Sequence, residues 1–232
     1  MVKFNCKSNL RFKFLFAMNI IWHGQSCFQI SSSQNKNGQA NIVIDPFDES
    51  LGLKPPKLEA DILLMTKKDY EHSGAKSVSG SPFVIDGPGE YETKEVFVEG
   101  IPILPVSEKE KSLSTIYTIE TEDVRICHLG AFNQKELTDD QVEKIGEIDI
   151  LMVPIGANDT IGTKEAIKIM SQIEPKITIP MYYQIPKLKM KLEGVDKFLK
   201  AMGIKKIEAL PKLSIKKKNI SSEEAKIIIL NP

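Results

Sequence analysis

A cluster of charged and metal-binding side-chain types directly follows an apolar stretch in the segment from Asp61 to Gly74. Residues 62–65 read as a buried strand, and the loop after it carries an ammonium, two carboxylates and an imidazole: Lys67, Asp69, Glu71 and His72. In α/β folds, chemistry is placed in loops at the carboxyl ends of such strands. Carboxylates and a neutral imidazole bind divalent metals, whereas an ammonium has no lone pair and repels them. The loop is therefore the first candidate for a functional site, although Lys67 opposes a strong metal centre there.

The composition excludes several classes of protein. Of 232 residues, 41% are hydrophobic and 27% charged, which is typical of a soluble globular chain and not of a disordered one. Because 31 Lys plus Arg balance 31 Asp plus Glu, no net positive field attracts nucleic acid. The apolar stretch at residues 14–22 is shorter than the roughly 20 residues of a membrane span. Cys6, Cys27 and Cys127 are too scattered for a disulfide framework, so reduced thiols and a cytoplasmic location are expected.

The motifs around the loop resemble those of the metallo-β-lactamase superfamily, in particular its small zinc-dependent hydrolases similar to ascorbate-phosphate lactonase. Thr66-Lys67-Lys68-Asp69-Tyr70-Glu71-His72 stands where the family has Thr/Ser-His-x-His-x-Asp-His. Other matching motifs are Asp45-Pro46, Gly87-Pro88-Gly89 and Cys127-His128-Leu129-Gly130. The resemblance starts at Met18. It implies an α/β protein with a four-layer αβ/βα sandwich, formed by a single domain over residues 18–232, with residues 1–17 as an N-terminal extension.

The resemblance also implies that most of the family's metal ligands are replaced in this chain. The replaced positions are Lys67 and Asp69 for histidines, Glu71 for an aspartate, Ala131 for the bridging aspartate and Tyr182 for the closing histidine. The loop near Pro105 also lacks the expected histidine, and only His72 matches. No cofactor is therefore expected, with zinc as the exception if His72 and Glu71 retain part of a degenerate site.

Four further polar residues lie close to these motifs. Gln25 replaces the histidine of the family's Gly-His-Ser turn, and His23 lies two residues earlier, where strand alternation would keep it on the same face. We nevertheless expect His23 to be a polar residue at a strand end. For His128 we expect a hydrogen-bonded structural role. Asp45, which supports the metal loop in the family, can accept backbone N–H bonds without any metal.

Two functions follow from this pattern. The preferred interpretation is a non-catalytic protein retained for binding or assembly, with a small molecule or protein as partner and with formation of a homo-oligomer left open. Lys67 would then replace a metal charge by pairing with Asp69, Glu71 or both. The alternative is a hydrolase of small esters, lactones or phosphorylated metabolites with a rebuilt or single-metal site, in which Lys67, Asp69 and Tyr182 are the catalytic candidates.

Hydrophobic periodicity and turn residues predict the elements that position these groups. We expect hairpins pairing residues 26–30 with 40–44 and 115–120 with 124–128, a strand at 96–98 that follows the bend at 82–92, and buried strands at 149–154 and 176–181. Helices are expected at 137–145 with a Thr138/Gln141 capping box, at 163–173 with Thr163 as its cap, and around Phe198. The three lysines at 216–218 are expected in a turn between two edge strands, before a last strand at 227–230.

Overall fold

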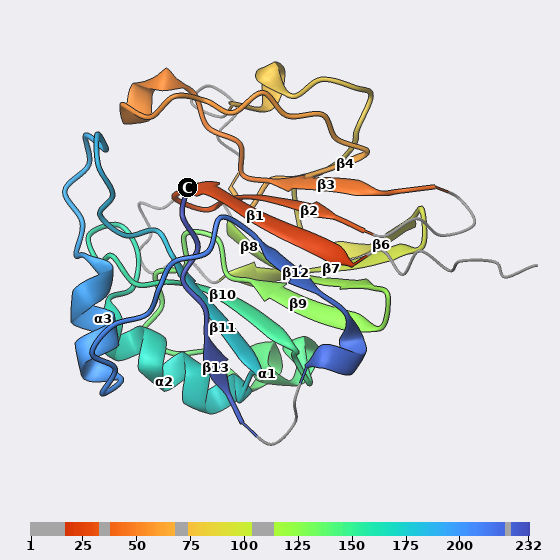
Figure 1. Cartoon of the computed structure of the whole chain (residues 1–232). Helices are drawn as coiled ribbons and strands as arrows, with labels where there is room; N and C mark the ends of the chain where they lie inside the picture. Colours follow the sequence, from red (N-terminus) through yellow and green to blue (C-terminus); the bar gives the residue numbers. More distant parts are fainter. Residues whose placement is uncertain (1–16, 33–37, 68–73, 104–113, 221–223) are drawn as a thin grey trace, which may run out of the picture.

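The protein is described by a computed structural model that covers residues 17–32, 38–67, 74–103, 114–220 and 224–232. Two β-sheets are stacked on one another (Figure 1). The first sheet contains, in spatial order, β12 (Leu213–Ile215), β1 (Met18–Gly24), β2 (Cys27–Ser31), β3 (Asn41–Ile44), β4 (Ile62–Leu64) and β5 (Phe83–Ile85). The second contains β13 (Lys226–Ile227), β11 (Ile177–Met181), β10 (Ile150–Pro154), β9 (Val124–His128), β8 (Ser114–Thr121), β7 (Val96–Ile103) and β6 (Gly89–Thr93).

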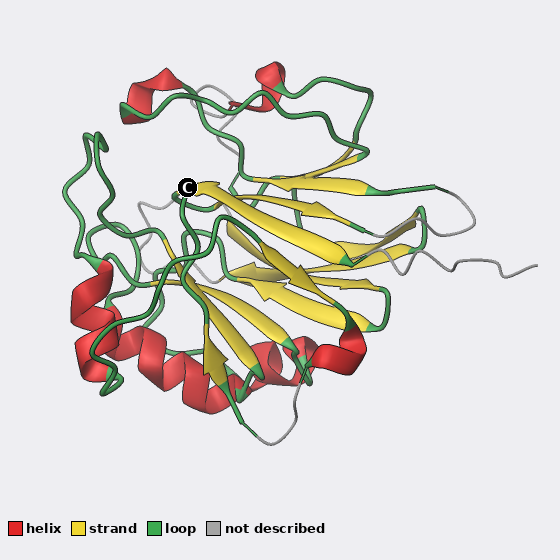
Figure 2. Ribbon diagram, in the orientation of Figure 1, coloured by secondary structure: helices red, strands yellow, loops and turns green. Residues whose placement is uncertain are grey.

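The helices cover the outer faces of the sandwich. In the described residues, the α-helices are α1 (Asp139–Ile145), α2 (Thr163–Ile173) and α3 (Val195–Ala201), and they lie along the second sheet (Figure 2). The first sheet is covered on its outer side by loops and by two short 3-10 helices, η1 (Glu49–Leu51) and η2 (Gly74–Ser77). The expected α/β sandwich is confirmed, with a thinner outer layer on the first sheet than on the second.

Strand alternation explains how the first sheet joins two apolar layers. In β3, Ile42 and Ile44 pack in the main core between the sheets, while Val43 packs in a second cluster under the outer loops. In β4, Ile62 and Leu64 face the main core and Leu63 faces the second cluster. Since side chains alternate along a strand, an unbroken apolar run is what a strand covered on both faces requires.

Most of the predicted elements are confirmed. The pairs β2 with β3 and β8 with β9 are the expected antiparallel hairpins, and β6 pairs with β7 after the predicted bend. The predicted capping box is present at α1, where Gln141 N–H donates to Thr138 Oγ1 over 3.2 Å and Thr138 N–H donates to Gln141 Oε1 over 3.0 Å. Cys27 and Cys127 are buried free thiols whose pKa values are raised by burial.

Three local predictions are wrong in detail. Thr163 is the first residue of α2 and not its cap: Gly162 precedes the helix, and its N–H donates to Glu165 Oε2 over 3.2 Å. The last strand is shorter than expected, because β13 ends at Ile227 and Leu230 forms an isolated bridge with Leu210. On α2, helical spacing predicts an apolar face made of Ala166, Ile167, Met170 and Ile173. Ile169 is fully buried as well, whereas Ile167 and Met170 are half-buried.

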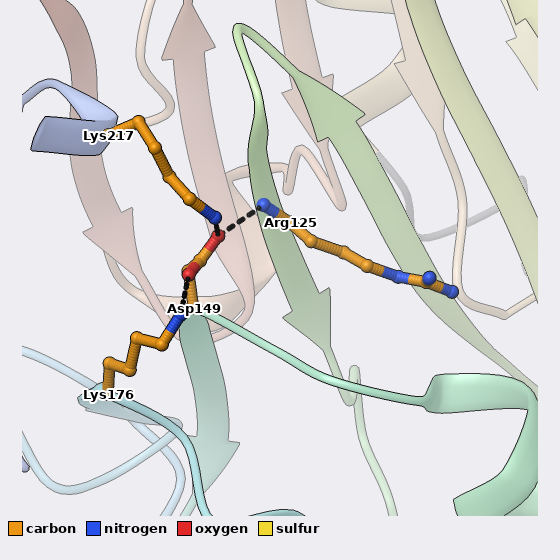
Figure 3. Close-up of polar contacts among 4 residues, drawn as sticks. All are labelled: Arg125, Asp149, Lys176 and Lys217. Carbon is orange, nitrogen blue, oxygen red and sulfur yellow. Dashed lines mark hydrogen bonds and ion pairs between the residues drawn. The ribbon is translucent and has the colours of Figure 1, made fainter. Parts of the chain in front are cut away.

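A buried carboxylate ties the amino-terminal ends of the second sheet to the C-terminal segment (Figure 3). Asp149, just before β10, accepts hydrogen bonds from Lys176 Nζ at 2.8 Å, Lys217 Nζ at 2.6 Å and the backbone N–H of Arg125 at 3.0 Å. Lys217 begins the 3-10 helix η3 (Lys217–Asn219). The lysine run does lie between two edge strands, β12 and β13, as predicted, but Lys217 has a structural partner there.

None of the helices that the structure describes is long and apolar enough to cross a bilayer.

Candidate functional site

A small pocket lies where strands of both sheets end. Strands β3 and β4 are parallel, as are β9, β10 and β11, so their carboxyl ends meet at the same end of the sandwich. The pocket has a volume of about 170 Å³. The residues lining it are Gln25, Ser26, Asp45, Pro46, Phe47, Leu51, Met65, Thr66, Lys67, Ala131 and Tyr182. Gln25, Lys67, Ala131 and Tyr182 are thus brought together from the β1–β2 turn and from segments after β4, β9 and β11.

Asp45 fixes the ends of β3 and β4 relative to one another. Its carboxylate accepts from the backbone N–H of Thr66 at 2.7 Å and from Thr66 Oγ1 at 2.6 Å. The expectation that Asp45 accepts a backbone N–H bond is confirmed. Because Thr66 already engages both carboxylate oxygens, Asp45 acts as a support for the loop that follows β4.

Gly130 allows the second sheet to approach this support closely, and Gly156 allows the segments after β10 and β11 to pack against one another. At Gly130, with φ of 59°, an added Cβ would lie 2.6 Å from the side chain of Thr66. At Gly156 an added Cβ would lie 2.1 Å from the carbonyl oxygen of Tyr182. A larger residue at either position would push apart segments that line the pocket. The close approach of Gly130 to Thr66 is therefore a packing reason for a glycine just before Ala131, and it involves no metal.

Three lining residues have backbone conformations in the left-handed region. The φ values of Gln25, Asp45 and Tyr182 are 51°, 45° and 53°. Non-glycine residues seldom adopt such values, and strained backbone concentrates at sites of function. The segments are also joined directly, because Tyr182 N–H donates to the carbonyl of Gln25 over 3.1 Å.

Gln25 has a buried amide side chain in the pocket lining. Its exposed fraction is 3%, and neither Nε2 nor Oε1 has a partner within the described part of the chain. Its backbone carbonyl is used, since it also accepts from Trp22 Nε1 at 2.8 Å. Leaving a buried polar group unpaired costs about 1–3 kcal/mol. Sequence reasoning identified Gln25 as a replaced histidine but gave no signal that its amide would be unpaired.

Lys67 and Tyr182, two of the three predicted catalytic residues, line the same pocket. The Tyr182 hydroxyl is neutral at ordinary pH, because burial and the charges of Asp159 and Asp45 raise its pKa to about 12. Lys67 is exposed and forms no ion pair with a described residue. Lys67 lies one residue beyond buried Thr66, where the chain leaves the sheet.

His128 has a structural role, as expected. It is fully buried, its Nδ1 accepts from Gly130 N–H at 3.1 Å, and its Nε2 lies 3.0 Å from the carbonyl of Ser26. Since Nδ1 accepts, the ring is neutral with its proton on Nε2. Burial lowers the pKa of His128, against the opposing effects of the Asp45 charge and the hydrogen bonds. Neither nitrogen has a lone pair left for a metal.

His23 also lies away from the pocket. It bonds Gln29 Oε1 at 3.4 Å and lines a separate cavity with Ile185 and Pro232. The expectation that His23 is a polar residue at a strand end is consistent with this position. The whole chain contains three histidines. With His23 and His128 placed elsewhere, His72 is the one imidazole that remains for this pocket.

The other predicted site residues, Asp69, Glu71 and His72, lie outside the described residues, as does the loop at Pro105. Their roles as catalytic or metal-binding groups stay predictions, and so does the pairing of Lys67 with the two carboxylates. Within the described ranges, no three His, Cys, Asp or Glu side chains form a group able to hold a metal ion. In the lining that is described, Asp45 is the one carboxylate, and a cation stands beside it. These groups do not fit a dinuclear zinc centre, which needs several imidazoles and free carboxylates.

Comparison with known proteins gives the family. Residues 19–182 match the family model described as a beta-lactamase superfamily domain. The chain belongs to this superfamily. Among curated relatives, it is 31% identical over 194 residues to a metal-dependent hydrolase of Thermococcus onnurineus, covering 69% of this chain and 82% of that one. A metal-dependent hydrolase of Thermoplasma volcanium is 29% identical over 200 residues, covering 72% and 83% of the two chains.

Solved structures of the superfamily agree with the fold. A protein of Thermotoga maritima, described as a Zn-dependent hydrolase of the metallo-beta-lactamase superfamily, has a TM-score of 0.75 at 32% identity, covering 92% of this chain and 98% of that one. The metallo-beta-lactamase fold protein YhfI of Bacillus subtilis has a TM-score of 0.58 at 11% identity, covering 92% and 97%. The second likeness concerns the fold alone.

Proposed function

We propose that this superfamily member binds a small ligand in the pocket at the end of β4 and does not hydrolyse substrates through a dinuclear zinc centre. The observation that carries the proposal is the pocket lining, which contains Gln25, Lys67, Ala131 and Tyr182. By the resemblance, these residues replace the histidine of the Gly-His-Ser turn, a histidine of the metal loop, the bridging aspartate and the closing histidine, in that order. The amide, the ammonium and the phenol offer hydrogen-bond donors, and Ala131 offers no donor atom for a metal. Among the described residues, none favours a role in assembly over ligand binding.

Metal-dependent hydrolysis is the second candidate. In its favour, the relatives from Thermococcus and Thermoplasma carry that description at 31% and 29% identity, and His72, Glu71 and Asp69 are ligand types close to the pocket in sequence. Against it, at most one imidazole is available and the positively charged Lys67 lies at the pocket. Loss of even a partner that only orients a metal ligand lowers metal affinity or activity by about 10 to 100-fold.

The test is the metal content of the full chain, purified without chelator, together with its hydrolysis of lactones, phosphodiesters and β-lactams. We expect less than about one equivalent of zinc and no hydrolysis that chelation abolishes, since a catalytic site needs at least three protein ligands per zinc. Two tightly bound equivalents, or activity lost with chelator and regained with metal, would reject the proposal in favour of the second candidate.

A matched variant makes the metal measurement informative in both directions. Ala131→Asp combined with Tyr182→His returns two of the family's ligand types to the pocket lining. Histidine tolerates the left-handed backbone of position 182 better than most residues do. We expect this variant to retain more zinc than the natural chain under the same conditions, which would show that the purification itself does not strip metal.

A further inference from the structure

The buried amide of Gln25 lowers the stability of the folded protein, which a purely structural residue at this position would not do. Its side chain is buried, and neither polar atom of its amide has a partner among the described residues. A methionine would have nearly the same shape without a polar group to desolvate. Buried polar groups are normally paired, and an unpaired one in a pocket wall is where a ligand completes the hydrogen bonds.

Two other polar side chains line the same pocket. Tyr182 has no side-chain hydrogen bond to a described residue and is a neutral donor, and Lys67 has no ion pair to a described residue. With Gln25 they come from the β1–β2 turn and the ends of β4 and β11. The backbone strain at Gln25 and Tyr182 is consistent with side chains held in place for a ligand.

The chemistry of these three groups defines the ligand. They supply several N–H and O–H donors and one positive charge, and Gln25 Oε1 is an acceptor without a partner among the described residues. Asp45 lies in the same pocket lining, and its negative charge disfavours a dianion such as phosphate. A volume of about 170 Å³ holds roughly five or six water molecules at about 30 Å³ each, so the ligand has few heavy atoms.

We propose that the pocket binds a small monocarboxylate that carries a neighbouring hydroxyl group, with its carboxylate on Lys67 and Tyr182 and its hydroxyl on the Gln25 amide. The inference rests on the proposed function, because metal ions in this pocket would present different groups to a ligand. It goes beyond that function by naming the ligand class and by assigning Gln25 a role in recognition.

The experiment measures binding of glycolate, lactate, acetate and inorganic phosphate to the full chain by calorimetry and by the shift in melting temperature. We expect the two hydroxycarboxylates to bind most tightly, acetate at least about fivefold more weakly because Gln25 then stays unpaired, and phosphate more weakly still.

Gln25→Met should raise the melting temperature of the free protein and weaken binding of lactate by at least about fivefold. This opposite effect on stability and binding would not arise from a merely structural residue.

Gln29→Met is the matched control. Gln29 is half-buried on β2, bonds His23 and lies outside the pocket, so its variant should bind lactate as the natural chain does.

Tyr182→Phe keeps the aromatic ring and tests the same inference if Gln25→Met does not fold. This variant should also lower the affinity for lactate at least about fivefold. Equal binding of acetate and lactate, unchanged affinity in Gln25→Met or Tyr182→Phe, or no binding of any probe would overturn the inference. If the protein is zinc-free, these results would reject the inferred ligand class but not the proposed function. Two bound equivalents of zinc would reject the proposed function itself.

Discussion

At the scale of single residues, the histidines show how burial and partners decide a role that residue type leaves open. His128 is the last residue of β9 and part of a family motif, yet its two ring nitrogens are occupied by Gly130 N–H and the Ser26 carbonyl. A T-shaped contact with Phe28, at 5.6 Å between ring centroids, fixes the ring plane. His128 therefore holds the β1–β2 turn against the end of β9, so that Gln25 and Ala131 face the same pocket.

The first prediction concerns the pH dependence of this contact. The pKa of His128 is lower in the folded protein than its ordinary value of about 6.5. At pH values between these two pKa values, His128 is protonated in the unfolded chain and neutral in the folded protein. The stabilisation is complete above about pH 6.5 and declines as the pH falls through the folded pKa, by at most about 1.4 kcal/mol per pH unit for one proton. Denaturant unfolding between about pH 7 and 5 should show a smaller loss in His128→Asn, which keeps an acceptor for Gly130.

His23→Gln serves as the comparison for that measurement. Its pKa is also lowered by burial, but the side chain is half-buried and bonded by Gln29, so a smaller part of the acid loss should disappear. An unchanged pH slope in His128→Asn would show that His128 is protonated in the folded protein or is more accessible than its burial indicates.

At the scale of elements, the carboxyl ends of the strands carry the pocket and the amino ends of the second sheet carry an ionic anchor. Asp149, 3% exposed, joins the strands β9, β10 and β11 to η3 through Arg125, Lys176 and Lys217. Burial alone would raise the pKa of Asp149, but the hydrogen bonds from Lys176, Lys217 and Arg125 hold it below its usual value. The C-terminal segment is thereby held across both sheets, since β12 pairs in the first and β13 in the second.

The second prediction is that Asp149→Asn destabilises the protein by about 1.5–3 kcal/mol at pH 7, the range for hydrogen bonds to charged groups. Because the folded-state pKa of Asp149 is lowered, its contribution is complete above about pH 4 and is lost as the pH falls through the folded value. The difference between variant and natural chain should therefore shrink in acid. Unfolding by denaturant at pH 7 and at about pH 3 measures both quantities.

Glu136→Gln is the control for the ionic anchor. Glu136 pairs with Lys168, but both side chains are more than half exposed, so solvent screening leaves little net stabilisation. We expect no more than a small change from this variant at either pH. An Asp149→Asn variant as stable as Glu136→Gln would mean that the two lysines are satisfied equally well by water.

At the scale of the whole molecule, the described chain forms one sandwich whose β1 begins at Met18, where it pairs with Ile215 of β12. The family match begins at residue 19. Residues 1–16 lie outside the described part, so the expectation that residues 1–17 are an extension stays a prediction. Expectations of a cytoplasmic location and of partners also stay predictions.

The third prediction is that deleting residues 1–17 leaves thermal stability little changed, because the strand pairing of β1 starts after them. Thermal unfolding of the full chain and of a chain starting at Met18 tests this. A fall in melting temperature beyond about 5 °C, on the order of 1–2 kcal/mol for a chain of this length, would show that Phe12, Phe14 and Phe16 pack on the domain.

The sequence alone determined the family and the order of the elements, because these depend on local patterns. Period-2 apolar runs indicate strands, Thr138 and Gln141 form a cap over three residues, and Ala131 lacks a donor atom whatever surrounds it. Errors at this level arose where a neighbour in space decided the outcome, as at Thr163, whose expected capping role belongs to Gly162 and Glu165.

Only the tertiary structure decided which side chains are engaged and which are free. Residues 25, 67, 131 and 182 are far apart in sequence, and they share a pocket because two stacked sheets bring the ends of parallel strands together. Partners such as Ser26 for His128, or Lys217 for Asp149 across 68 residues, leave no periodic signal in the chain. Burial depends on what other segments cover, which is why Lys67 is exposed and the amide of Gln25 is enclosed without a partner among the described residues.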